Sequence, residues 1–122
     1  MGVWSTKPWG NDEAADWFHD FWNCNDFELV MSEIENFNPS NENYDSVRAA
    51  CYVVACFGSA YSWPIKYLDR RKDIMNKSID ILSKMINPPN DNWTFLDMWD
   101  NNKDAIASVE NQIENIKLML NE

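Results

Sequence analysis

Residues 45–61 read DSVRAACYVVACFGSAY and are apolar on nearly every side of a helix, with Arg48 and Ser59 as the main interruptions. A helix without a polar face has to be covered by neighbours. Its alanines and Gly58 are small enough to let those neighbours approach closely. Trp63-Pro64 follows soon after, and the residue before a proline is disfavoured in a helix. This stretch therefore predicts a buried central helix, around which the remaining segments are expected to pack.

Amphipathic patterns on both sides of this stretch predict the other helices. Apolar side chains recur three and four positions apart along residues 27–37 and again along residues 67–86. A first helix is expected over residues 12–22, with Asn11 or Asp12 as its N-cap. The last segment begins near Thr94 with a short apolar turn and continues as a helix. That helix carries a narrow apolar seam of Ile106, Val109, Ile113, Ile116 and Leu120.

Length and composition bound the architecture. A chain of 122 residues suits one domain, residues 1–122. Its 3 glycines and 5 prolines favour long helices over a turn-rich β fold, since the prolines fall at breaks between apolar segments. Trp4 and Trp9 are costly to leave in water, so residues 1–10 are expected to pack onto the body. We therefore predict an all-α, compact single-domain bundle of about five helices with an ordered, non-helical N-terminal arm.

The charge is strongly negative and unevenly placed. The formal net charge is −10: residues 1–61 hold ten acids against Lys7 and Arg48, a net −8, whereas residues 62–122 hold ten acids against eight bases, a net −2. Such a surface repels phosphate backbones and anionic lipid and attracts basic partners. We therefore expect neither a nucleic-acid nor a membrane partner. The alternative interpretation is that net charge only keeps the protein soluble.

The second half of the chain contains a cluster of basic residues, but the net charge of that half stays negative. Acidic residues interleave with its cations, so we interpret it as a solvated helix face that pairs with the acidic first half. The cluster consists of Lys66, Arg70, Arg71 and Lys72.

The cysteines and the hydropathy pattern favour the cytoplasm. Cys51 and Cys56 lie five apart in the most apolar segment, so on a helix they do not share a face, and with Cys24 they make an odd number. This suits reduced, inert thiols, and we expect Cys51 and Cys56 to be buried in that segment. No signal-peptide pattern opens the chain. The longest unbroken apolar run, residues 49–57, is far shorter than the ~20 residues that a membrane span needs.

Neither an enzyme nor a cofactor is expected, because no Gly-x-Ser-x-Gly, Walker or Gly-x-Gly-x-x-Gly motif occurs. The alternative is a small metal-binding protein or enzyme. Asp16 and His19, three apart, could share a helix face, and Asp12, Asp16 and Asp20 recur every fourth residue. No second carboxylate–histidine motif is present to complete a coordination shell, so we predict no metal site.

Acids and aromatics alternate between residues 9 and 28. Aromatic anchors rimmed by charge are typical of protein interfaces, although the same aromatics could instead fill the core. The candidate partner-binding residues are Asp12, Glu13, Asp16, Asp20, Asp26, Glu28, Trp17 and Trp22.

The opening of the chain resembles a bacterial family of unknown function. Members of that family begin Met-Gly-x-Trp-Gly, then an aromatic residue, then Asn-Asp-x-Ala-x-Asp-Trp. Here the motif appears as Met1-Gly2-Val3-Trp4, then Trp9, then Asn11-Asp12, Ala14-Ala15 and Asp16-Trp17, with Ser5 where the family usually has glycine. The alanine-rich helix that ends at Gly58 and the later Leu96-Asp97-Met98-Trp99 resemble the family more loosely. The resemblance implies no established activity, but small acidic proteins of this kind recur as immunity partners of bacterial contact-delivered toxins.

The sequence thus leads us to expect a cytoplasmic immunity protein. It would neutralise a cognate toxin with a basic, nuclease-type domain by binding it through an acidic surface. The rival prediction is the metal-binding protein or enzyme built on Asp16 and His19. A third possibility is a homo-oligomer that associates through the apolar seam of residues 106–120.

Overall fold

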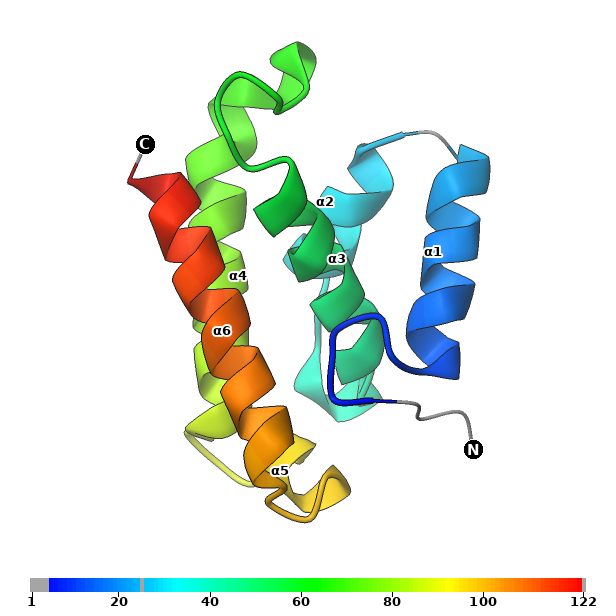
Figure 1. Ribbon diagram of the computed structural model, residues 1–122, viewed down its shortest axis with the longest axis vertical. Coiled ribbons are helices and arrows are strands. Elements are labelled where there is room, and N and C mark those ends of the chain that lie inside the picture. Colours follow the sequence, from blue (N-terminus) through cyan, green and yellow to red (C-terminus); the bar gives the residue numbers. More distant parts are fainter. Residues whose placement is uncertain (1–4, 25, 122) are drawn as a thin grey trace.

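The apolar stretch forms α3, Tyr44–Cys56, in the middle of the computed structural model, which describes residues 5–24 and 26–121 (Figure 1). Eight of its thirteen residues are buried, and it packs against α1, α2, α4 and α6. The prediction of a buried central helix is confirmed. The described residues contain no strand, so the all-α class is confirmed as well.

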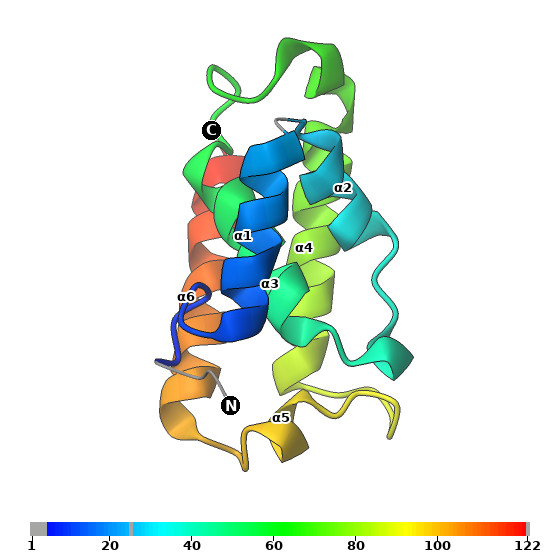
Figure 2. The ribbon, with the colours of Figure 1, turned by 90° about the vertical axis from the view of Figure 1, so that its right-hand side faces the viewer.

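Two helices cover one side of α3: α1, Asp12–Cys24, and α2, Glu28–Glu35 (Figures 1 and 2). Asn11 begins α1 as predicted, because its Oδ1 accepts a hydrogen bond from the N–H of Ala14 at 2.8 Å. Two residues before α2, the Asp26 Oδ1 accepts a hydrogen bond from the N–H of Glu28, the first residue of the helix, at 3.0 Å. Helix α2 buries Val30, Met31 and Ile34, the face that its spacing indicated.

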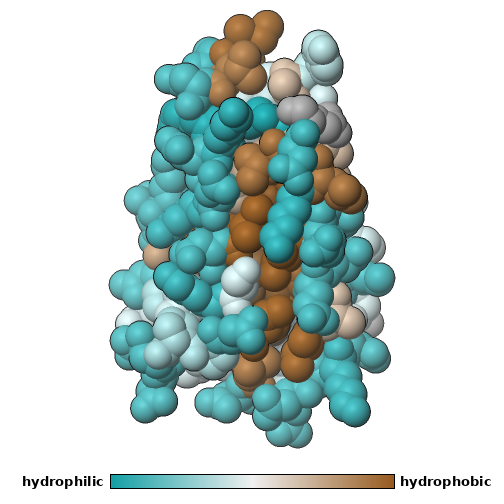
Figure 3. Space-filling view, turned by 90° about the vertical axis from the view of Figure 1, so that its left-hand side faces the viewer, coloured by the Kyte–Doolittle hydropathy of each residue, from teal (hydrophilic) through white to brown (hydrophobic). Residues whose placement is uncertain are grey.

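The other side of the molecule is an antiparallel pair, α4, Arg71–Ile86, and α6, Lys103–Leu120 (Figure 1). The one-turn helix α5, Phe95–Met98, lies between them in the chain. Val109, Ile113 and Ile116 of the predicted seam are buried, and α6 packs most extensively on α4. The seam therefore serves the interior of the molecule. On this side an apolar stripe flanked by hydrophilic residues reaches the surface, and further apolar groups lie at the top and at the right edge of the view (Figure 3).

Two predicted boundaries are wrong. The central helix ends at Cys56 rather than continuing to Tyr61, and the segment before α4 is a 3-10 helix, η2, Ile65–Arg70. Gly58 lies so close to its neighbours that a Cβ there would meet Met75 Cε and the Val54 carbonyl, each at 2.6 Å. The Gly58 carbonyl accepts a hydrogen bond from Arg71 Nε at 2.6 Å. Gly58 directly follows the C-cap Phe57, a position where glycine commonly ends a helix. A second short 3-10 helix, η1, Pro39–Asn41, links α2 to α3.

Residues 5–10 of the predicted arm form a non-helical turn that packs on α3, and residues 1–4 lie outside the described residues. The Ser5 N–H donates to the Gly10 carbonyl at 3.1 Å, and a Cβ at Gly10 would collide with Ser5 Oγ. The Trp9 ring lies against Tyr52 of α3, with 5.0 Å between ring centroids. Trp9 remains 46% exposed, so this residue of the arm contacts α3 without being buried.

Arg48 joins the arm to the helices. It is 1% exposed. Its Nε donates to Gln112 Oε1 at 2.8 Å, and its Nη2 donates to Ser108 Oγ at 2.9 Å and to the Thr6 carbonyl at 3.0 Å. Burial lowers the pKa of Arg48 to about 10, which still leaves the side chain charged at neutral pH. One buried cation thus fixes the arm, α3 and α6 relative to one another.

None of the helices in residues 5–24 and 26–121 combines the length and hydropathy needed to cross a bilayer.

Candidate functional site

Helix α1 lies at the outside of the helical body (Figure 2), and three of the predicted partner-binding residues on it are exposed together. Asp12, Asp16 and Asp20 are all exposed, and none of them forms an ion pair with a described residue. They follow one another at intervals of four, which places them along one side of the helix. Opposite them, Ala14, Trp17 and Phe21 face the core. We call Asp12, Asp16 and Asp20 the acidic stripe.

The two tryptophans of α1 have different environments. Trp22 is 63% exposed, which fits its predicted place in an interface. Trp17 is only 6% exposed and stacks on Phe21, with 5.5 Å between ring centroids. The prediction that Trp17 contacts a partner is therefore wrong. Its position, three residues after Ala14 and four before Phe21, places it on the buried side of the helix.

Glu13 lies on the flank of α1 and is used inside the molecule. Its Oε2 accepts hydrogen bonds from the N–H of Ser46 at 2.6 Å and from Ser46 Oγ at 2.9 Å, in the first turn of α3. A carboxylate at a helix N-terminus satisfies free N–H groups and complements the helix dipole. Glu13 therefore fastens α1 to the start of α3 and does not extend the acidic stripe.

Asp26 and Glu28 are also engaged. Asp26 Oδ1 accepts from the Glu28 N–H and from the Tyr67 hydroxyl at 3.3 Å, and the backbone hydrogen bond lowers the pKa of Asp26. Glu28 pairs with Arg70 Nη1 at 3.0 Å, and Arg70 also pairs with Glu35. These contacts join α2 to η2. The acidic stripe thus carries the uncompensated part of the predicted set.

The basic cluster proves to have two roles. Arg70 pairs with two acids of the first half, as the interleaved charges indicated. Arg71 is buried, against the prediction of a solvated face, and its Nη2 donates to the Met119 carbonyl at 2.5 Å. The guanidinium is taken into the interior because carbonyls at the ends of α3 and α6 need donors there.

Three carboxylates meet where α1, α2 and α3 converge. Burial raises the pKa of Glu33, opposed by a hydrogen bond from Asn43 Nδ2 at 2.7 Å and reinforced by the nearby charge of Glu13. Burial also raises the pKa of Asp45, with Glu13 adding to the effect and Arg48 opposing it. Desolvation and like charge disfavour the ionised forms of the half-buried Glu33 and Asp45, whereas Glu13 is exposed and bonded to Ser46, so none of the three extends the acidic stripe.

An aromatic cleft of about 510 Å³ opens beside the C-terminal end of α1. We call it the aromatic cleft; its main lining residues are Phe21, Trp22, Phe27, Phe57, Pro64 and Tyr67. Phe57 is 42% exposed, and Asp26 and Lys66 contribute the charged groups of the lining. Large apolar side chains around a concavity are the usual seat of interface hot spots. The sequence pattern located Trp22 but not Phe57 and Tyr67, because each of these lies in a stretch that was predicted as helix, residues 45–61 and residues 67–86.

Asp16 and His19 do not gain further ligands. His19 is exposed, and its Nε2 lies 3.1 Å from Asn23 Nδ2 of the same helix. Within residues 5–24 and 26–121, no three side chains of His, Cys, Asp or Glu gather closely enough to hold a metal ion. Of the cysteines, Cys51 is buried, and burial raises its pKa to about 12. Cys56 is exposed, so the expectation that it is buried is wrong.

Comparison of the chain with protein-family models, with curated proteins and with solved structures gives no match. The resemblance of the N-terminal motif to a bacterial family therefore stays a prediction, and the functional argument rests on the residues of this chain.

Proposed function

We propose that this chain is an immunity-type binding protein, which neutralises a bacterial toxin by covering a basic surface on it. The observation that carries the proposal is the acidic stripe: Asp12, Asp16 and Asp20 are exposed and lack a cation partner among the described residues. Other acids of the first half, by contrast, are tied to Ser46 or Arg70.

The acidic stripe would act mainly on the rate of association, and the aromatic cleft mainly on the rate of dissociation. Carboxylates at a rim steer a basic partner and raise the rate of association. Trp22 stands 63% exposed at the mouth of the cleft, on the same helix as the stripe. A large aromatic anchor of this kind lowers the rate of dissociation when it is buried at the centre of an interface. A toxin that cleaves nucleic acid needs a basic cleft to hold its substrate, and a protein seated over that cleft would exclude the substrate.

The first test is protection. The product of the gene next to this one is expressed in a bacterial host with and without the chain, and survival is measured. Rescue of growth together with co-purification of a basic protein supports the proposal. If the neighbouring product is harmless, or remains toxic although the chain is present, the immunity function is wrong.

The second test locates the surface. A triple variant with Asp12→Asn, Asp16→Asn and Asp20→Asn should bind the toxin at least about tenfold more slowly at low salt, because steering is lost. Trp22→Ala should mainly speed dissociation. The control replaces three exposed acids elsewhere by Asp73→Asn, Asp97→Asn and Glu110→Gln, which makes the same change in net charge. Equal slowing in both triple variants would show that net charge, not the stripe, governs association.

A further inference from the structure

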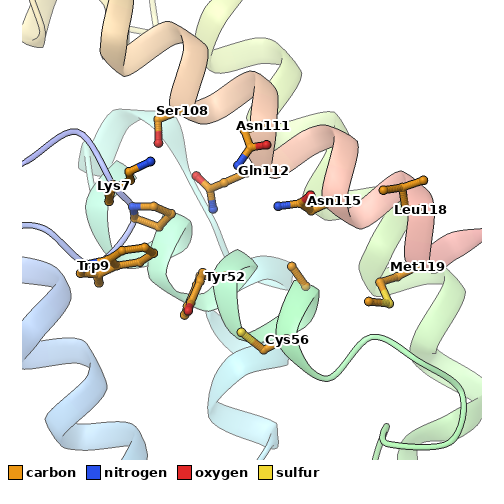
Figure 4. A pocket seen from close by; sticks show the side chains of 12 residues that line it. Lys7, Trp9, Tyr52, Cys56, Ser108, Asn111, Gln112, Asn115, Leu118 and Met119 are labelled. Carbon is orange, nitrogen blue, oxygen red and sulfur yellow. The ribbon is translucent and has the colours of Figure 1, made fainter.

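A second concave site lies on another face of the molecule, between the N-terminal arm, α3 and α6 (Figure 4). We call it the amide groove; its volume is about 260 Å³. Its lining residues include Lys7, Trp9, Tyr52, Asn111, Asn115 and Leu118. The groove shares no residue with the acidic stripe or with the aromatic cleft.

The charge of the groove is opposite to that of the chain. The protein has twenty acidic residues, yet none of the described residues that line the groove is an Asp or a Glu. Lys7 is its one cation, and it is exposed and forms no ion pair with a described residue. Lys7 and Ser108 lie at one end of the groove, and Leu118 and Met119 lie at the other (Figure 4). The site is therefore complementary to a ligand with a carboxylate at one end and an apolar group at the other.

The two walls between these ends suit a polypeptide backbone. Asn111 and Asn115 are exposed, stand one turn apart on α6, and line one wall. Each side-chain amide can donate and accept at once. Four helical residues advance about 6 Å, and two residues of an extended chain advance about 6.6 Å. The two amides are thus spaced to pair with every second peptide unit of an extended segment, while Trp9 and Tyr52 offer an aromatic surface on the opposite wall (Figure 4).

The groove is also held in shape before any ligand arrives. Arg48 binds the Thr6 carbonyl of the arm and, through Ser108 and Gln112, the wall formed by α6. Both walls are consequently fixed to α3, which lowers the entropy cost of binding. Burying the Arg48 guanidinium costs desolvation free energy. Holding the two walls of the groove in place gives this buried cation a role.

We propose that the amide groove binds an extended peptide segment that ends in a carboxylate, with the carboxylate at Lys7, the backbone amides on Asn111 and Asn115 opposite Trp9 and Tyr52, and an apolar side chain at Leu118 and Met119. The carboxylate is the free C-terminus of that segment, because Lys7 lies at one end of the groove and not between the two walls (Figure 4). This inference is independent of the proposed immunity function, because it rests on different residues and needs no toxin.

The experiment uses the full chain and two random octapeptide libraries displayed on phage. One library ends in a free C-terminus, and in the other the octapeptide is followed by a fixed Gly-Ser segment. Enriched peptides are then synthesised with a fluorescent label, in carboxylate and carboxamide forms, and titrated by fluorescence polarisation. A requirement for the free C-terminus supports the proposal, whereas binding that depends on an Asp or Glu inside the peptide and not on the free C-terminus would contradict it.

Variants decide whether the groove is the site. The pair Asn111→Ala and Asn115→Ala, made together, should weaken binding about tenfold or more, and Lys7→Gln should weaken it about tenfold. The matched controls are Asn76→Ala, an exposed asparagine of α4, and Lys117→Gln, an exposed lysine of α6, and both should bind within about twofold of the wild type. Circular dichroism checks that every variant keeps its helix content. No enrichment from either library, enrichment without a carboxylate, or unchanged binding by the Asn111 and Asn115 variant would overturn the proposal.

Discussion

At the scale of single residues, the interior of this protein contains several charges whose burial has to be explained. Glu33 and Asp45 lie near Glu13 at the junction of α1, α2 and α3, and burial raises the pKa of both. A carboxylate that is desolvated beside another carboxylate favours its protonated form. Ionisation of these groups therefore opposes folding at neutral pH, although Asn43 and Arg48 offset part of the effect.

Glu33→Gln tests this effect. The folded-state pKa of Glu33 is raised above the usual 4.5, so the folded protein binds more protons than the unfolded chain between 4.5 and that raised value. Stability contributed by this group therefore falls as the pH rises through that window. Glu33→Gln should unfold at a higher urea concentration than the wild type at pH 7. The difference should vanish below the usual glutamate pKa, where both side chains are neutral.

The measurement is urea unfolding followed by circular dichroism from about pH 3 to about pH 8. Glu110→Gln, on the exposed side of α6, is the control and should follow the wild type throughout. A stability gap between Glu33→Gln and wild type that grows toward acid pH would have the wrong sign and would refute this account of Glu33.

At the scale of helices and loops, the arm is attached to the body through Arg48 rather than through a continuous apolar surface. Trp9 contacts Tyr52 but keeps 46% of its surface exposed, so its burial alone is a modest contribution. The hydrogen bond from Arg48 to the Thr6 carbonyl supplies a directional contact. The docking of the arm should therefore depend on this one side chain more than on the aromatic pair.

Arg48→Met should lower the free energy of unfolding by about 1–3 kcal/mol, because Gln112 Oε1 loses its donor inside the core while methionine fills much of the volume. Hydrogen exchange of the peptide covering residues 5–11 should become faster than in the wild type. The control is Arg70→Met, which removes half-exposed ion pairs and should cost less than about 1 kcal/mol. Equal losses in the two variants, with the arm still protected, would mean that Arg48 does not hold it.

Most of the helices were predictable from the spacing of apolar residues in the sequence. The apolar spacing of α2 and α6 follows one face of a helix, and that face is buried. The end of α3 was predicted too late, at Tyr61, because residues 57–61 are nearly as apolar as the helix before them. Gly58, which directly follows the C-cap Phe57, is the local signal for the end of the helix. The hydrogen bond from Arg71 to the Gly58 carbonyl is a tertiary contact that the local pattern does not indicate.

The candidate sites were less predictable than the helices. Charge spacing located the acidic stripe and composition located Trp22, but Trp17 was assigned to the surface when its helical position places it in the core. The amide groove was missed altogether. Its residues come from three segments of the chain, and only the spacing of Asn111 and Asn115 on one helix hinted at it. A site assembled by tertiary structure leaves little trace in one sequence without its relatives.

At the scale of the whole molecule, the uneven distribution of charge lowers stability without contributing to the fold. Residues 1–61 have a net charge of −8, and the acidic stripe places like charges four residues apart on α1. Like charges at that spacing destabilise a helix. Asp12 gains from the dipole at the start of α1, but Asp16 and Asp20 lie beyond the first turn. The protein keeps these two acids in an unfavourable place, which is what a surface shaped for a partner would show.

Asp16→Asn removes both like-charge contacts of the stripe, with Asp12 and with Asp20. It should raise the free energy of unfolding by up to about 1 kcal/mol at low salt, since each such pair costs about 0.2–0.5 kcal/mol. Between about 0.01 M and about 1 M NaCl the Debye length falls from about 30 Å to about 3 Å, so the gain should shrink with added salt. Asp80→Asn is the matched comparison, because Asp80 pairs with Lys84 at 3.1 Å on α4 and its neutralisation should destabilise slightly. Urea unfolding at the two ionic strengths measures both. If Asp16→Asn lowers stability as Asp80→Asn does, the stripe is a structural feature of α1, and the argument that its carboxylates are reserved for a basic partner loses its physical basis.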